Sequence, residues 1–289
     1  MSASRFLITG ASGQLGRLVI DGMLKTVPAA QIGVLVRSDK AAAEFAARGL
    51  HVHKGDYSRP DTLAAAFAGV DRAQLISSSE VGQRLPQHRN VVEAARQSGV
   101  KLLAYTSLLH ADASPLGLAE EHRQTEAALK ASGVPYALLR NGWYTENYAA
   151  SIPAALAHGA MIGSAGAGRI ASAARADYAE AAVRVLTASD DPAGKTYELA
   201  GDTSYTLAEF AAELARQSGK TLAYQDLPEA AYKAALVSAG LPEPFAALLA
   251  DSDAGAAKGA LFDDSHSLSK LIGHPTTPFA ETIAAALKA

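Results

Sequence analysis

Three glycines spaced three residues apart follow a short apolar strand near the start of the chain, and they constrain the fold more than any other feature. The predicted strand is Phe6–Thr9, and a helical pattern with an apolar face begins inside the motif. Glycine suits such a turn because a Cβ would block a left-handed residue or a close approach of backbone. Backbone N–H groups at the start of the helix can then face a pyrophosphate. The turn predicts a nucleotide cofactor, bound by Gly10, Ala11, Ser12, Gly13, Gln14, Leu15 and Gly16.

The residue after the second predicted strand indicates which nucleotide is bound. The strand Ile32–Val36 ends at Arg37, where an acidic residue would accept from the ribose 2′-OH of NADH. Arginine suits the 2′-phosphate of NADPH instead, because its planar fork of donors matches phosphate oxygens. The two features together favour NADPH over NADH. An ordinary strand-to-helix turn and a solvated arginine are the alternative interpretations.

Composition excludes several classes of function. The chain has 289 residues, of which 49% are hydrophobic and 19% are charged, so it can bury an extensive core. The net charge of −3 gives no reason to expect nucleic-acid binding. Cysteine is absent from the sequence, which excludes disulfides, thiolate metal sites and a cysteine nucleophile.

Location and metal binding follow from the same inspection. The sequence lacks an apolar run of about eighteen residues, the length that a membrane-spanning helix needs. Residues 1–5 are too few and too polar for a signal peptide, so we expect a cytoplasmic protein. His51 and His53 share one face of a strand, but a third ligand at suitable spacing is missing, so we expect no metal. The sequence leaves the oligomeric state open.

Strands and helices alternate through the first half of the chain. Further strands are predicted at Ile32–Val36, His51–His53, Ala73–Ile76, Leu102–Thr106 and Tyr136–Leu139. Helices are predicted at Gln14–Lys25, Ala41–Ala47, Asp61–Phe67, Gln87–Gln97 and Leu118–Ala131. This alternation is typical of an α/β fold with right-handed crossovers, a Rossmann-type doubly wound parallel sheet. The expected strand order is 3-2-1-4-5-6, with the ligand at the switch point between strands 1 and 4.

The pattern changes after Arg140. A glycine-rich stretch over 159–174 is predicted to form turns, and the chain from Thr206 onward is mostly helical. Between them, the helix Asp177–Thr187 and the strand Thr196–Leu199 are expected to return to the sheet. We therefore predict a cofactor-binding Rossmann domain over residues 1–150, joined by residues 175–200. The remainder of 151–289 is predicted to form a smaller, mainly helical lobe that covers the substrate.

Five segments carry a resemblance to a known family. They are Ile8–Gly16, Leu75–Arg84, Ala104–Asp112, Leu139–Tyr144 and Leu271–Thr276. The chain resembles the atypical short-chain dehydrogenases that include NmrA-like proteins, and within them the bacterial type 2 NAD(P)H:quinone oxidoreductases. The glycine motif is shared by many reductases. The serine triplet, the Ser-Leu-Leu-His-Ala-Asp run and the Asn-Gly-Trp-Tyr run are more specific, and the resemblance spans nearly the whole chain.

The resemblance implies flavin-free hydride transfer from NADPH to a quinone, with NADH as a weaker cofactor. It implies that Arg37 meets the 2′-phosphate and that Asp56 and Tyr57 lie near the adenine. The other residues that it implies for the cofactor are Ser77, Ser78, Ser79, Ser107, Asn141, Gly142, Trp143 and Tyr144. The alternatives are a serine loop that bonds its own backbone and aromatic residues that only pack in a core.

The sequence lacks the Tyr-x-x-x-Lys pair of most short-chain dehydrogenases. By resemblance, Leu118 takes the place of the tyrosine and His122 that of the lysine. A quinone that accepts hydride gives a phenolate-like anion, whose conjugate acid has a pKa of about 10 and needs less help from a general acid. His122 could bond a ribose hydroxyl or deliver a proton near neutral pH, or be an exposed helix histidine. Asn141 and Tyr144 could donate to a quinone oxygen.

Two further functions compete with quinone reduction. One is the reduction of other conjugated electrophiles, such as triphenylmethane dyes. The other is a non-catalytic NmrA-like sensor of NADP(H). If the chain is an enzyme, the electrophile's pocket is expected beside the nicotinamide, between residues 141–147 and the helical lobe that begins near Thr206.

Overall fold

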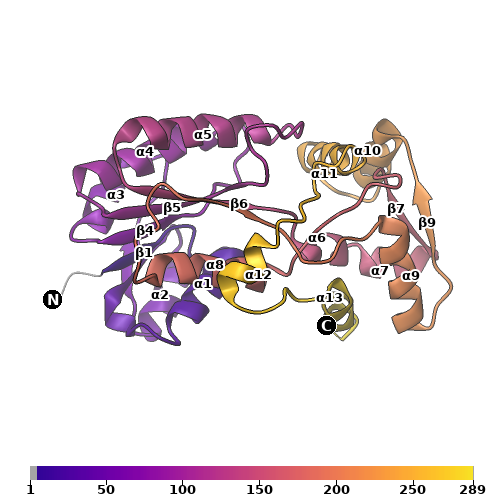
Figure 1. Cartoon of the computed structure of the whole chain (residues 1–289), viewed down its shortest axis with the longest axis horizontal. Coiled ribbons are helices and arrows are strands. Elements are labelled where there is room, and N and C mark those ends of the chain that lie inside the picture. Colours follow the sequence, from indigo (N-terminus) through magenta and orange to yellow (C-terminus); the bar gives the residue numbers. More distant parts are fainter. Residues whose placement is uncertain (1–4, 289) are drawn as a thin grey trace. The chain divides into compact units, whose positions relative to one another are not determined.

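Seven strands form one sheet in the order β3-β2-β1-β4-β5-β6-β8 in the computed structural model, which describes residues 5–288 (Figure 1). The strands are β1 Phe6–Ile8, β2 Ile32–Val36, β3 His51–Lys54, β4 Arg72–Leu75, β5 Leu102–Leu108, β6 Tyr136–Asn141 and β8 Thr196–Leu199. Neighbouring strands from β3 to β5 are parallel. The predicted order is confirmed, with β8 added beyond β6. Most of the polar segment before β1 lies outside the described residues.

Helices cover both faces of this sheet, as expected for a doubly wound fold. They are α1 Gln14–Met23, α2 Asp39–Ala47, α3 Pro60–Phe67, α4 Arg84–Gln97, α5 Ala119–Ser132 and α8 Arg175–Thr187. Figure 1 shows α3, α4 and α5 on one face and α1, α2 and α8 on the other. Leu63, Val91 and Leu129 are fully buried against the first face. The apolar runs predicted as strands are buried because both of their faces are covered.

Contacts divide the chain into two compact units. The first contains residues 5–111, 120–140 and 178–197, and the second contains residues 112–119, 141–177 and 198–288. The chain therefore leaves the first unit directly after Arg140, and the stretch 178–197 returns to it.

The second unit is mainly helical, as predicted. Its helices are α6 Thr145–Ala149, α7 Ile152–His158, α9 Leu207–Ser218, α10 Glu229–Ser238, α11 Glu243–Ala256, α12 Ser267–Ile272 and α13 Phe279–Ala286. It also contains two strands, β7 Ala160–Gly163 and β9 Ala223–Asp226, which pair in parallel. Sequence patterns missed both, because each is only four residues long and gains its conformation from a partner about sixty residues away.

Local sequence explains where several helices begin. Ser38 caps α2, and its hydroxyl accepts from the Ala41 N–H at 3.2 Å. Thr206 and Glu209 form a reciprocal capping box at the start of α9. Such caps satisfy N–H groups that lack partners within the helix. Among residues 5–288, the helices are too short or too polar to cross a bilayer.

Candidate functional site

The carboxyl ends of β1, β2 and β4 surround a pocket of about 270 Å³ in the first unit. The predicted site residues that line it are Gly10, Ser12, Gly13, Arg37, Asp56, Tyr57, Ser77, Ser78 and Ser79. The remaining lining residues are Leu35, Val36, Gly55, Ile76, Glu80 and Gln87. This is the switch point of the sheet. From β1 the strand order runs through β2 to β3 on one side and through β4 to β5 on the other.

The glycines of the first turn are needed for the reasons that the sequence suggests. Gly10 has a φ of +60°, and a Cβ there would lie 3.1 Å from the Ile76 Cβ. At Gly16 a Cβ would lie 2.5 Å from the carbonyl oxygen of Gly10, so α1 can approach the turn only without a side chain. The predicted conformational roles of these glycines are confirmed. Ala11, Leu15 and Gly16 are buried behind the pocket, whereas Gln14 is exposed.

Arg17 holds this turn from outside the pocket. Its Nε donates to the Ser12 carbonyl at 3.1 Å, and its guanidinium forms a bidentate ion pair with Glu44. The same guanidinium lies 5.4 Å from the ring centroid of Phe45. These three contacts orient the planar guanidinium, so it loses little further freedom when it bonds the Ser12 carbonyl.

Arg37 lies on the pocket rim, paired with carboxylates. Its Nη1 is 2.8 Å from Glu80 Oε1 and 3.8 Å from Asp56 Oδ2. The Arg37 side chain is 65% exposed, so a ligand in the pocket can reach it. Among the residues that line the pocket, Arg37 carries the one positive charge. An anion that enters the pocket therefore meets one guanidinium and two carboxylates.

Glu80 and Gln87 belong to the pocket, although sequence reasoning assigned neither of them. Gln87 Nε2 donates to Glu80 Oε2 at 2.8 Å and to Ser58 Oγ at 3.0 Å. Gln87 is buried, and its Oε1 has no hydrogen-bond partner within the described residues. The predicted strand order could have indicated both residues, because segments that follow strands 2 and 4 must flank strand 1.

Hydrogen bonds of the Ser78 backbone fix the position of the serine triplet. The Ser78 N–H donates to His88 Nε2 at 2.9 Å, and the Ser78 carbonyl accepts from Arg84 Nε at 2.6 Å. Burial, with a smaller contribution from the Arg84 charge, lowers the pKa of His88 to about 3, so its ring is neutral and can accept. The Ser78 hydroxyl accepts from the Glu80 N–H at 3.1 Å, which is the local backbone bonding considered above.

Ser107 lies at the end of β5 in a buried ionic network. Its hydroxyl donates to Glu126 Oε1 at 2.6 Å, and the same carboxylate accepts from Arg140 Nε at 2.9 Å and Nη2 at 2.7 Å. The Arg140 and Glu126 side chains are 7% and 4% exposed. Ser107 is not among the residues that line the pocket. Because its proton is engaged by Glu126, the hydroxyl can offer a lone pair to a ligand.

His122 is buried on α5 and lies outside the pocket lining. Its Nδ1 is 2.7 Å from the Tyr105 hydroxyl. Burial, followed by the charges of Arg84 and His88, lowers the pKa of His122 to about 3. Its ring is therefore uncharged at neutral pH, and it can act there through a neutral N–H or lone pair but not as an imidazolium.

Asn141, the last residue of β6, and Tyr144, three residues further on, lie together in the second unit. Asn141 Nδ2 donates to the Tyr144 hydroxyl at 3.3 Å, and Asn141 Oδ1 is buried without a hydrogen-bond partner within the described residues. The Arg175 guanidinium lies 4.7 Å from the centroid of the Tyr144 ring. Burial raises the pKa of Tyr144, so the phenol keeps its proton at neutral pH.

Trp143, by contrast, packs in an aromatic core of the second unit. It is 8% exposed, and its ring centroid lies 6.0 Å from that of Tyr148. Tyr148 contacts Phe210, which contacts Tyr205 and Phe279. Tilted and stacked rings at these separations attract each other, so this chain of aromatics stabilises the unit.

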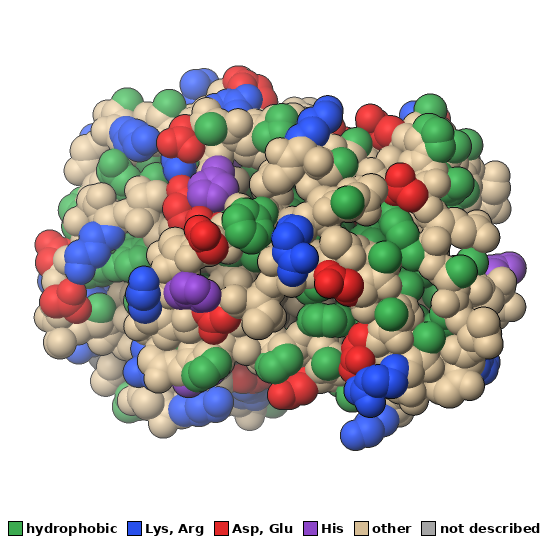
Figure 2. Space-filling model, turned by 45° about the vertical axis from the view of Figure 1, so that its right-hand side comes forward, with side chains coloured by type: hydrophobic (Ala, Val, Ile, Leu, Met, Phe, Trp, Pro, Cys, Tyr) green, Lys and Arg blue, Asp and Glu red, His purple; other side chains and the backbone are tan. Residues whose placement is uncertain are grey.

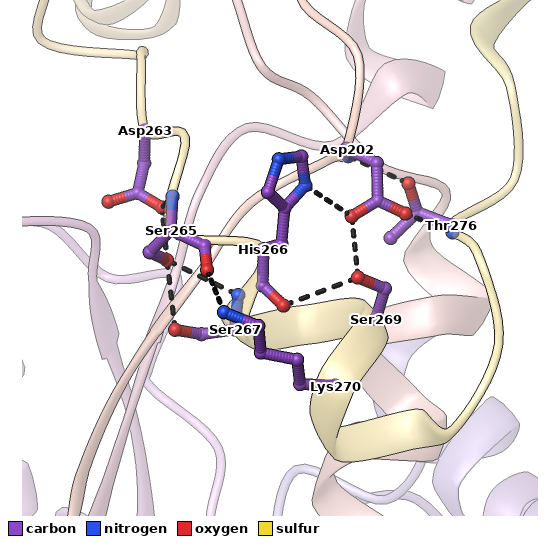
Figure 3. Close-up of polar contacts among 8 residues, drawn as sticks. All are labelled: Asp202, Asp263, Ser265, His266, Ser267, Ser269, Lys270 and Thr276. Carbon is purple, nitrogen blue, oxygen red and sulfur yellow. Dashed lines mark hydrogen bonds and ion pairs between the residues drawn. The ribbon is translucent and has the colours of Figure 1, made fainter.

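A second polar cluster contains the Ser, His and Asp residue types of hydrolase triads. His266 Nδ1 is 3.0 Å from Asp202 Oδ1, and this carboxylate also accepts from the Ser269 hydroxyl and the Thr276 N–H (Figure 3). Burial raises the pKa of Asp202, but these hydrogen bonds outweigh it and leave the pKa below its ordinary value. A triad needs a serine on the other imidazole nitrogen, whereas Ser269 bonds to the carboxylate. The cluster therefore attaches α12 to the loop after β8.

Charges of both signs are interspersed on the face drawn in Figure 2. On that face, side chains of a single sign do not form an extended patch. Among the described residues, His, Asp and Glu side chains do not gather in groups of three that could hold a metal ion.

Comparison with known proteins agrees with this geometry. Residues 10–189 match the family described as NAD(P)H-binding. Quinone oxidoreductase 2 of Escherichia coli (strain K12) is 60% identical to this chain over 276 residues, which cover 96% of both proteins.

Two solved structures extend the similarity to three dimensions. The NADPH complex of an NADPH-dependent quinone oxidoreductase from Escherichia coli shares 59% identity with a TM-score of 0.95, and the match covers 98% of this chain and 99% of that one. The triphenylmethane reductase of Citrobacter sp. in complex with NADP(H) shares 39% identity with a TM-score of 0.91, covering 97% and 99%.

Proposed function

This chain belongs to the NAD(P)H-binding family and to its type 2 quinone oxidoreductases, and on that premise we propose that it reduces quinones with NADPH and without flavin. One observation carries the proposal: the glycine turn and Arg37 line the same pocket. NADPH, when bound, supplies a hydride, and the quinone that receives it needs one proton to become a hydroquinone. NADH is the weaker cofactor, because it lacks the phosphate that Arg37 would bind.

The pocket residues fit such a dinucleotide. The Gly10–Gly16 turn offers backbone N–H groups and the start of α1 to a pyrophosphate. Arg37 offers its fork to the 2′-phosphate, and Asp56 and Tyr57 line the adenine side. The buried Gln87 Oε1, which lacks a donor, suits an amino group such as that of adenine. We assign Ser77, Ser78 and Ser79 to the ribose side.

Residues of the second unit are proposed to receive the quinone. The Asn141 amide and the Tyr144 phenol, which keeps its proton at neutral pH, are hydrogen-bond donors. A donor aimed at a quinone oxygen stabilises that oxygen more strongly as it gains charge. Ser107 and His122 are the next candidates for cofactor or substrate contact. His122 would act as a neutral ring, because its pKa lies far below 7.

One assay tests this function against its competitors. The purified chain is mixed with NADPH and a simple benzoquinone, and in a parallel arm with a triphenylmethane dye. We expect quinone-dependent loss of the NADPH absorbance. Turnover of the dye alone would favour the second function, which the 39% identity to triphenylmethane reductase supports. Tight NADPH binding with no turnover in either arm would indicate a sensor.

Tyr144→Phe is expected to lower kcat/KM for the quinone about 2- to 10-fold, the worth of one neutral hydrogen bond. The NADPH dissociation constant should change less than about twofold, because the variant keeps the ring. Tyr136→Phe, at the opposite end of β6, is the matched control and should leave both constants unchanged. Unchanged quinone kinetics in both Tyr144→Phe and Asn141→Ala would place the polar contacts elsewhere.

The purified protein is expected to turn over without bound flavin. The sequence contains one glycine-rich nucleotide turn, and that turn is assigned to the dinucleotide. Visible absorbance of the purified protein, with and without added flavin, checks this expectation together with the rate of quinone reduction. A stoichiometric yellow flavin that the activity requires would contradict the mechanism.

A further inference from the structure

The Arg37 guanidinium is engaged by a carboxylate at the place where a phosphate would bind it. Glu80 Oε1 lies 2.8 Å from Arg37 Nη1, a full charge-assisted hydrogen bond, and Asp56 Oδ2 adds a weaker contact at 3.8 Å. All three residues line the cofactor pocket. Phosphate oxygens seek the same donors of the fork, so they and Glu80 compete for one cation.

Glu80 is also held in position for this contact. Gln87 donates to its second carboxylate oxygen at 2.8 Å, and Gln87 is itself buried and bonded to Ser58. A carboxylate that is already oriented loses less side-chain freedom when it pairs with Arg37. The pair is thus a stronger competitor than a freely rotating surface glutamate would be.

We propose that Glu80 is a specificity-determining residue. It competes with the 2′-phosphate of NADPH for Arg37 and so reduces the preference for NADPH over NADH. The proposal rests on the NADPH site proposed above. The ribose 2′-OH of NADH carries no charge and can donate to a carboxylate. Its binding therefore does not tighten when Arg37 is freed from Glu80. Removal of the Glu80 charge should therefore favour the phosphorylated cofactor selectively.

Glu80→Gln tests this competition by calorimetry with two probes, 2′,5′-ADP and 5′-ADP, which differ in the 2′-phosphate. We expect 2′,5′-ADP to bind the variant about 3- to 10-fold more tightly, the range of an exposed ion pair plus lost repulsion. Binding of 5′-ADP should change less than about twofold. The control Glu93→Gln removes an exposed carboxylate that pairs with Arg96 on α4, and it should alter neither affinity.

The same change in an Arg37→Ala background separates competition from simple repulsion. Most of the gain should disappear there, because the cation for which Glu80 competes is gone. Three results overturn the proposal. The first is an unchanged affinity for 2′,5′-ADP in Glu80→Gln, and the second is an equal gain in affinity for 2′,5′-ADP and 5′-ADP. The third is a gain for 2′,5′-ADP that is as large in the Arg37→Ala background as in the unsubstituted chain. Failure of the unsubstituted chain to bind 2′,5′-ADP overturns it together with the NADPH site. Failure of quinone turnover alone, with the selective gain intact, overturns only the proposed reaction.

Discussion

NADPH is expected to bind Arg37→Ala about 10- to 100-fold more weakly than it binds the unsubstituted chain, while NADH affinity changes less than about twofold. A hydrogen bond to a charged group contributes about 1.5–3 kcal/mol, which corresponds to this range. The substitution also leaves Glu80 and Asp56 facing the phosphate without a counter-charge. Dissociation constants from fluorescence or calorimetric titration measure both affinities.

Two controls define what Arg37 does. Arg37→Lys keeps the charge but loses the planar fork, so it should fall between the alanine variant and the unsubstituted chain. Arg59→Ala removes an arginine of nearly equal exposure, 66%, that pairs with Asp61 and does not line the pocket. It should leave both affinities unchanged. Equal losses of NADPH and NADH in Arg37→Ala would remove this residue from the 2′-phosphate.

Glu126→Ala is expected to lower the free energy of unfolding by about 3–5 kcal/mol, the cost of breaking a buried ion pair by removing one partner. The variant would take from the Arg140 guanidinium, whose side chain is 7% exposed, the carboxylate of this ion pair, and it would remove the acceptor of the Ser107 hydroxyl. Urea unfolding followed by circular dichroism measures the change.

The same helix provides the matched control for this prediction. Glu120 pairs with Arg123 on α5, but its side chain is 57% exposed, so Glu120→Ala should cost no more than about 1 kcal/mol. Joint replacement of Glu126 by Leu and Arg140 by Met should recover most of the loss, because apolar side chains of similar volume need no partner. A loss below about 1 kcal/mol in Glu126→Ala would show that the buried pair contributes little.

The repeating elements of the first unit followed from the sequence alone. The strands Ile32–Val36 and Thr196–Leu199 were predicted with their observed bounds. For Ile32–Val36 the reason is that a buried parallel strand is a short apolar run between turn signals. Most other ends moved by one to three residues, where a terminal turn depends on caps more than on the pattern. Strand order followed from the handedness of the crossovers, and with it the position of the pocket.

Tertiary structure alone decided which side chains meet across those elements. The sequence indicated Arg37 as a phosphate ligand, but its pairing with Glu80 depends on the neighbouring ends of β2 and β4 about the central β1. It suggested His122 as a proton donor near neutral pH, whereas burial makes the ring neutral there. Burial and long-range pairing arise from residues far apart in the chain, which a local pattern does not contain.

The strands β7 and β9 show the same division. Their composition resembles turns and helices, and only their pairing with each other makes them strands. The sequence by itself therefore determined the doubly wound sheet, the glycine turn and the type of cofactor expected there. Each of these depends on the local spacing of residues and on the conformational freedom of glycine. The ion pairs, the neutral histidines and the small second sheet depend on distant neighbours, so only the tertiary structure decided them.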